Sequence, residues 1–100
     1  MGRVESSIQT DVIKYLRGRG CYVYNVPGSA SSAKGTSDLL VCYKGLFVAI
    51  ELKRPDGDYG ETVSQRIRRK QVTKADGTAE VVTSIADVAT LLHSLRGVTQ

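Results

Sequence analysis

The chain has 100 residues, carries 14 basic and 10 acidic side chains, and contains a single histidine. A chain of this length buries roughly 60 to 70% of its unfolded surface, which is enough for one modest core, so we expect one domain over residues 1–100. No apolar run approaches the roughly 20 residues that cross a bilayer, so we expect a soluble, cytoplasmic protein with no membrane partner; the formal charge of +4 favours polyanionic partners.

Residues 5–18 are predicted to form the first helix. Ile8, Val12 and Leu16 recur at helical spacing, and Gly20 follows the end of the run. Glu5 falls on the same apolar stripe, where a carboxylate is unusual in a purely structural helix. It is either a favourable charge at the helix N-terminus or part of a functional site.

A first strand is predicted over residues 21–26, where apolar and polar side chains alternate. The loop that follows, residues 28–37, is rich in Ser, Gly and Ala and contains Lys34, which we include among the candidate nucleic-acid contacts. Cys21 and Cys42 lie in apolar strand runs without C-x-x-C spacing. We therefore expect both to be buried, reduced thiols.

A β-hairpin is predicted in the centre of the chain. Residues 38–43 and 46–53 are apolar runs that flank the dipeptide Lys44-Gly45, a turn in which Gly supplies a positive φ. Both faces of this hairpin are largely apolar. We therefore expect helices to cover both faces of the sheet, as in an α/β layered domain.

Counting outward from this turn places Asp38 directly opposite Glu51, with their Cβ atoms roughly 5 Å apart. Lys53 projects from the same face, because side chains alternate along a strand. Like charges at this distance repel, and a hard divalent cation is a reason to pair them. Mg²⁺ or Mn²⁺ takes carboxylate oxygens and can also use the backbone carbonyl of Leu52. The alternative is a solvated cluster of charges at the strand ends, or a register slipped by one residue.

Lys53 has a role in such a site that suits its type. It can orient or help to deprotonate an attacking water, or neutralise charge that develops on a phosphate.

The second half of the chain is predicted to alternate helix, strand and helix. Residues 54–62 read as a loop, a helix runs from Thr62 or Val63 to Ala75, and Gly77 ends it. A strand over residues 78–83 and a helix over residues 85–95 complete the order α-β-β-β-α-β-α.

Basic residues crowd the second helix. They are either a solvated helix face or a grip on a phosphate backbone. The tyrosines do not form the interleaved pattern of single-strand binders, which favours duplex or branched DNA as the partner. The candidate contacts in this helix are Arg66, Arg68, Arg69, Lys70 and Lys74.

Gly35-x-x-Asp38, a hairpin, and then Glu51-x-Lys53 resemble the catalytic core of the PD-(D/E)xK nuclease superfamily. Within this superfamily, the whole chain resembles the virus-type replication-repair nuclease (VRR-NUC) domain in its small, standalone, phage-like form. That family opens with a helix carrying a glutamate, here Glu5, and follows its Glu-x-Lys with a glycine-rich loop and a helix bearing a glutamine. One departure is Ser37, where the superfamily name records a proline; this position shapes a turn and does not bind metal.

The resemblance implies a restriction-endonuclease-like core and a metal-dependent endonuclease acting on DNA, with selectivity for branched substrates such as Holliday junctions. It implies that Glu5 is a direct or water-mediated metal ligand. Of two candidate glutamines we favour Gln65 over Gln71, because a side chain in the first turn of the helix is more easily placed near the metal. The expected catalytic residues are Asp38, Glu51, Lys53 and Gln65.

Minimal members of this family act as homodimers, so the resemblance also implies a dimer that presents two sites to a branched junction. Two other functions remain open from the sequence. One is a restriction-type or RNA-directed nuclease on the same core. The other is a nucleic-acid-binding module without catalysis, whose carboxylates form surface ion pairs.

Overall fold

The computed structural model of the protein describes residues 5–27, 37–53 and 62–96, and the side chains of residues 5–7 and 96 lie outside this description. The predicted order of elements is confirmed. None of the helices in these ranges is long and apolar enough to span a membrane. The elements are α1 (Glu5–Gly18), β1 (Tyr22–Asn25), β2 (Leu39–Tyr43), β3 (Leu46–Leu52), α2 (Val63–Lys74), β4 (Thr78–Val82) and α3 (Ile85–Arg96).

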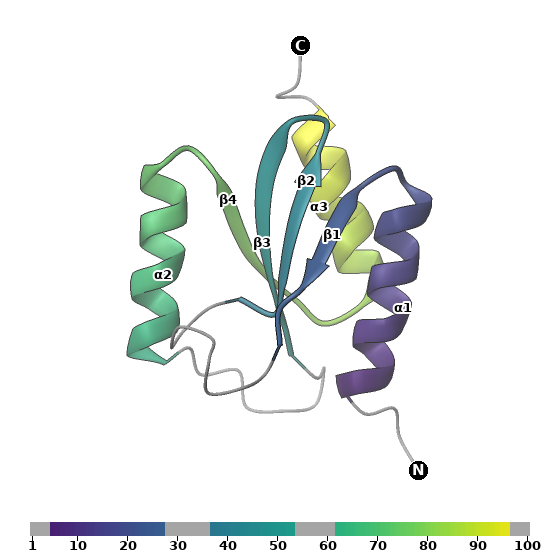
Figure 1. Cartoon of the computed structure of the whole chain (residues 1–100), viewed down its shortest axis with the longest axis horizontal. Coiled ribbons are helices and arrows are strands. Elements are labelled where there is room, and N and C mark those ends of the chain that lie inside the picture. Colours follow the sequence, from purple (N-terminus) through teal and green to yellow (C-terminus); the bar gives the residue numbers. More distant parts are fainter. Residues whose placement is uncertain (1–4, 28–36, 54–61, 97–100) are drawn as a thin grey trace.

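The four strands form one mixed sheet in the order β1-β2-β3-β4. The first three strands are antiparallel, and β4 runs parallel to β3. A parallel pair needs a crossover, and α2 supplies it. In Figure 1, α2 lies on one side of the sheet, while α1 and α3 lie on the other.

The turn between β2 and β3 has the backbone that the sequence predicted. Lys44 and Gly45 have φ values of 51° and 85°, as in the hairpin turns that match the twist of the flanking strands. The resulting register pairs Tyr43 with Leu46 and Leu39 with Ile50. The predicted register of the hairpin is therefore confirmed as far as Leu39 and Ile50, the pair that adjoins Asp38 and Glu51.

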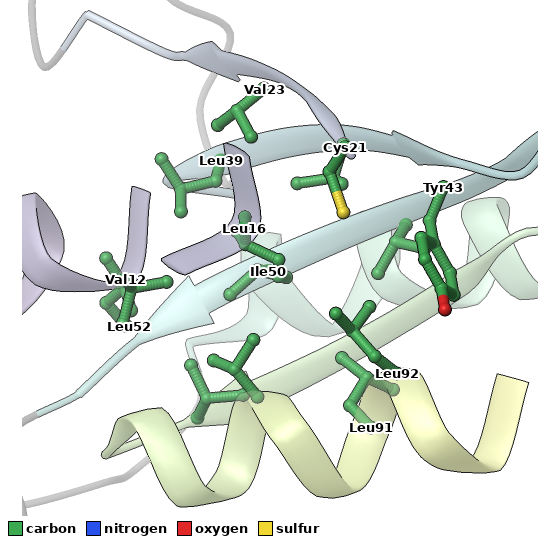
Figure 2. Close-up of a cluster of buried hydrophobic side chains, with 14 of the residues drawn as sticks. Val12, Leu16, Cys21, Val23, Leu39, Tyr43, Ile50, Leu52, Leu91 and Leu92 are labelled. Atoms are coloured by element: carbon green, nitrogen blue, oxygen red, sulfur yellow. The ribbon is translucent and has the colours of Figure 1, made fainter. Parts of the chain in front are cut away.

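The core lies between one face of the sheet and the helices α1 and α3. Helix α1 contributes its apolar stripe, in which Val12 and Leu16 are completely buried. Gly20, with φ of 86°, lets the chain leave this helix and enter β1. Figure 2 shows α1 and α3 packing on the same side chains of the strands, and α3 contributes Leu91 and Leu92. The strand side chains include Val23, Leu39, Tyr43, Ile50 and Leu52.

The opposite face of the sheet is only partly covered. Helix α2 packs against β4 and buries none of its own side chains. Three aromatic side chains on β1 and β3 stay exposed, with Tyr22 at 69%, Tyr24 at 48% and Phe47 at 46%. Cys21 is buried as expected, and burial raises the pKa of its thiol. The expectation of a buried Cys42 is wrong, because Cys42 points to this uncovered face.

Helix α3 begins with a capped first turn. The backbone N–H of Asp87 donates to Ser84 Oγ over 3.1 Å. Asp87 Oδ2 in turn accepts from the backbone N–H and the hydroxyl of Thr83, both over 2.8 Å. These bonds to the ionised form lower the pKa of the Asp87 carboxyl, with the backbone bond as the larger cause.

Candidate functional site

Glu51 and Lys53 lie at the end of β3, on the face of the sheet that faces α2. Lys53 Nζ lies 4.0 Å from Glu51 Oε2, and the side chains of the two residues are 20% and 15% exposed. The backbone N–H of Lys53 donates to Val82 O over 3.0 Å, which continues the β3–β4 pairing past the last residue of the strand. The sheet therefore holds the Glu-x-Lys motif in an extended backbone with both side chains on one face.

Gln65, in the first turn of α2, reaches this carboxylate. Its Nε2 donates to Glu51 Oε2 over 3.0 Å. Gln71 lies two turns away in the helix, where its Oε1 accepts from Arg68 over 3.3 Å. Of the two candidate glutamines, the structure thus brings Gln65 to the acidic group, as the position in the first turn suggested.

Asp38 lies one step beyond the last pair of the β2–β3 ladder, where the register places it opposite Glu51. Its Oδ2 accepts a hydrogen bond from the backbone N–H of Leu52 over 2.7 Å. Its backbone carbonyl accepts from Val26 N over 3.0 Å, which ties the same residue to the end of β1. At the open end of the hairpin, Asp38 thus bonds to β3 through its side chain and to the residue that follows β1 through its backbone.

The backbone carbonyl of Leu52 belongs to the same corner. In a strand the N–H and the C=O of one residue point to the same side. Since the N–H of Leu52 points to Asp38, the carbonyl oxygen also faces the β2 side of the strand. The three predicted oxygen donors, Asp38, Glu51 and Leu52, therefore come from neighbouring positions at one end of the hairpin.

Glu51, Lys53 and Gln65 line a small hollow between the sheet and α2. Arg69, one helical turn after Gln65, lines it as well. This arrangement sets a carboxylate beside three nitrogen donors. The rest of the lining consists of Ser37, Ala79, Glu80 and Val81.

The other predicted site residues either do not line this hollow or lie outside the description. Glu5 opens α1, but its side chain lies outside the description, and Lys34 lies outside the described residues altogether. Arg68 lines a second, more apolar groove between α2 and the sheet, together with Phe47 and Gln71. The remaining candidate contacts on α2, Arg66, Lys70 and Lys74, are exposed.

The donor set at the hairpin end suits a hard cation. Among the described residues, no group of three or more Asp, Glu, His or Cys side chains could hold a metal ion. Mg²⁺ does not require such a group, because it keeps several waters and binds through one or two carboxylates. Asp38 and Glu51 with the carbonyl of Leu52 therefore fit Mg²⁺ or Mn²⁺ better than a metal that needs an all-protein cage.

Thr62 is a residue of this site that the sequence reasoning missed. Its hydroxyl accepts from the backbone N–H of Gln65 over 3.1 Å, and its own backbone N–H donates to Gln65 Oε1 over 3.0 Å. Together these bonds form a capping box. The pattern Thr-x-x-Gln before an amphipathic run is the signal that could have located both the cap and the orientation of the glutamine.

No family model and no curated protein matches the sequence. The structure is similar to that of a solved VRR_NUC domain, with a TM-score of 0.72 and 22% identity over 89% of this chain and 94% of that chain. It is also similar to a VRR_NUC domain protein, with a TM-score of 0.71 and 22% identity over 94% of this chain and 88% of that chain. The fold implied by the sequence motifs is thus confirmed.

Proposed function

We propose that this chain, whose fold is that of the VRR_NUC domain, is a divalent-metal-dependent endonuclease that hydrolyses phosphodiester bonds in DNA. The observation that carries the proposal is the meeting of Glu51, Lys53 and Gln65 at the end of β3. A carboxylate and an ammonium from one strand and an amide from a helix are held there by backbone pairing and a helix cap. A solvated cluster of surface charges has no need of such support.

Each residue has a distinct task in this mechanism. Asp38, Glu51 and the carbonyl of Leu52 would hold Mg²⁺ or Mn²⁺, which polarises a phosphate and lowers the pKa of bound water. The Lys53 ammonium, a compact charge on a flexible stem, binds a phosphate oxygen and offsets the negative charge that grows there during attack. Gln65 keeps Glu51 in a fixed orientation.

The basic residues of α2 would bind the DNA backbone. Arg69 shares the hollow with Glu51, so a phosphate held by its guanidinium lies next to the acidic group. A guanidinium suits this task, because its planar fork matches two phosphate oxygens. Arg66 and Lys70, its exposed neighbours in the helix, extend the positive charge beyond the hollow.

A test of the nuclease function uses linear, flapped, nicked and four-way DNA, each with Mg²⁺, with Mn²⁺ and with EDTA. We expect cleavage with either metal, none with EDTA, and preference for the branched substrates. Glu51→Gln should abolish cleavage and leave the thermal unfolding transition in place. Asp76→Asn is the matched control, because Asp76 is exposed, and its φ of 70° is one that Asn also tolerates.

The alternative, a nucleic-acid-binding module, gives a different result in the same assay. It predicts that DNA affinity is the same with Mg²⁺ and with EDTA, that Glu51→Gln binds as wild type, and that no substrate is cut. RNA substrates of the same shapes distinguish an RNA-directed nuclease from one that acts on DNA.

The uncovered face of the sheet supports a homodimer as the active form. Tyr22, Tyr24 and Phe47 are exposed there. This patch is apolar, whereas the basic residues gather on α2. The patch is therefore better suited to bind another apolar surface than to bind DNA. A second copy offers such a surface, because a two-fold axis brings the same patch against itself. Two active sites would then face one branched substrate.

Light scattering on the purified protein tests this assembly. We expect twice the mass of one chain for the wild type. Tyr22→Glu should give the mass of one chain, since it places a charge in the patch. Ile85→Glu is the control, because Ile85 is also an exposed apolar residue but opens α3 on the far side of the sheet. A monomeric wild type would contradict the homodimer.

A further inference from the structure

The side-chain amide of Gln65 can have only one orientation. Its Oε1 accepts from the backbone N–H of Thr62, a group that can only donate. Its Nε2 faces Glu51 Oε2, which in the ionised carboxylate can only accept. Exchanging the oxygen and nitrogen of the amide would set oxygen against oxygen at one end and N–H against N–H at the other. Gln65 is therefore a donor toward the site.

The two bonds of the amide link the cap of α2 to the end of β3. Thr62 holds the first turn of the helix, and Gln65 passes that constraint to Glu51. Core packing does not supply this constraint, because α2 buries none of its side chains. The position of the helix N-terminus relative to the acidic group thus rests on polar contacts.

The Gln65 amide and the Lys53 ammonium both approach the same oxygen of Glu51. Oε2 accepts from Gln65 and lies 4.0 Å from the Lys53 ammonium. Fixing one oxygen of a carboxylate from two directions fixes the plane of the group, and therefore also the direction of its other oxygen. A ligand held in this way loses less freedom when a cation binds.

We propose that Thr62 is a positioning residue for the candidate metal site: its hydroxyl caps the first turn of α2, so that its backbone N–H can hold the Gln65 amide, which in turn orients the carboxylate of Glu51. This inference rests on the proposed function, since it assigns to Glu51 the role of a metal ligand. In this proposal Thr62 acts through Gln65 and is not itself a ligand of the cation. Its contribution is the orientation of a ligand, which the metal affinity measures without any cleavage.

Calorimetric titration of the metal-free protein with Mg²⁺ tests the role of Thr62. Thr62→Val keeps the shape of the side chain and the backbone N–H that bonds Gln65 Oε1, but removes the hydroxyl that accepts from the Gln65 backbone N–H. Because the capping box needs both bonds, the first turn and the amide lose their fixed geometry, and we expect Mg²⁺ affinity to fall about 10-fold. Thr62→Ser, which restores the acceptor, should restore the affinity. In the Gln65→Met background, Thr62→Val should cause little further loss, because Thr62 acts through Gln65.

The control is the equivalent cap on a helix that does not reach the site. Ser84→Ala removes the acceptor at the start of α3, and we expect a similar loss of stability with unchanged Mg²⁺ affinity. A second readout is the NMR signal of the Gln65 side-chain amide in metal-free protein, which should move in Thr62→Val and stay in place in Ser84→Ala.

The outcomes separate the two proposals. If the wild type neither binds Mg²⁺ nor cuts DNA, the proposed function is wrong, and the role of Thr62 is wrong with it. If the wild type does both, but Thr62→Val binds Mg²⁺ as tightly as wild type, only the role of Thr62 is wrong. Equal losses of affinity in Thr62→Val and Ser84→Ala would also overturn it, because they would indicate an effect of stability alone.

Discussion

Asp38 Oδ2 accepts a hydrogen bond from the backbone N–H of Leu52 over 2.7 Å. The bond closes the open end of the β2–β3 hairpin, one step past the pair Leu39 and Ile50. The structure thus shows one task of Asp38, which ends the strand pairing, and the proposed function adds a second, in which the charge of the carboxylate holds a cation.

The variant Asp38→Asn separates these tasks. It keeps an oxygen that can accept from Leu52 N–H but removes the negative charge. We expect Mg²⁺ affinity to fall by more than about 10-fold, while the urea unfolding midpoint stays near that of wild type. Asp38→Ala should lose the affinity and also about 1 to 3 kcal/mol of stability, because the N–H loses its partner. Wild-type Mg²⁺ affinity in Asp38→Asn would remove Asp38 from the ligand set.

Arg69→Ala should weaken DNA binding through the loss of a phosphate contact beside Glu51. We expect the slope of log affinity against log salt to become shallower by about 1, as for one lost phosphate contact. Fluorescence anisotropy at several salt concentrations, with Ca²⁺ in place of Mg²⁺ to prevent cleavage, measures the slope. Lys44→Ala is the control of equal charge, because Lys44 lies in the turn at the opposite end of the hairpin. An equal change in both variants would indicate only a loss of net charge.

Gly77, between α2 and β4, has no room for a side chain. A Cβ atom there would lie 2.9 Å from Val72 Cγ1, 3.1 Å from Phe47 Cδ2 and 3.2 Å from Val72 O. We expect Gly77→Ala to destabilise the protein by about 1 to 3 kcal/mol. Gly18→Ala, at the end of α1, meets nothing within 4 Å and should be neutral or stabilise by up to about 1 kcal/mol. Denaturant unfolding of the two variants measures the contrast, and equal effects would contradict it.

The cap at the start of α3 predicts a pH dependence of stability. The hydrogen bonds from Thr83 lower the pKa of Asp87 from its ordinary 3.8. The stabilisation is therefore fully present above that value and is lost as the pH falls through the lower, folded pKa. The difference in unfolding free energy between wild type and Asp87→Asn should be constant from about pH 5 to 7 and shrink below about pH 4. A difference that grows on acidification would contradict the assignment.

The sequence was a good guide where neighbours along the chain decide the structure. The turn at Lys44-Gly45 sets the hairpin register, because each step outward from a two-residue turn pairs the next two residues. The register then puts Glu51 and Lys53 on one face, since side chains alternate in an extended chain. The apolar stripe of α1 likewise follows from helical spacing alone.

Cys42 shows where such local reasoning fails. Its strand is apolar on both sides, a pattern that favours burial on both faces. Coverage of the second face, however, depends on where α2 comes to rest, and α2 packs against β4 and leaves the face of β1 and β2 open. The pattern of a strand says which face a residue points to but not what lies above that face.

The sequence by itself therefore determined the order of the elements, the hairpin register and the common face of Glu51 and Lys53, because turn geometry and strand alternation act between close neighbours. Only the tertiary structure decided that Gln65 and Arg69, and not Gln71, line the hollow that holds Glu51 and Lys53. It did so because the placement of α2 depends on its cap at Thr62 and on the tight approach at Gly77. These are contacts between segments that the spacing of residues along the chain does not specify.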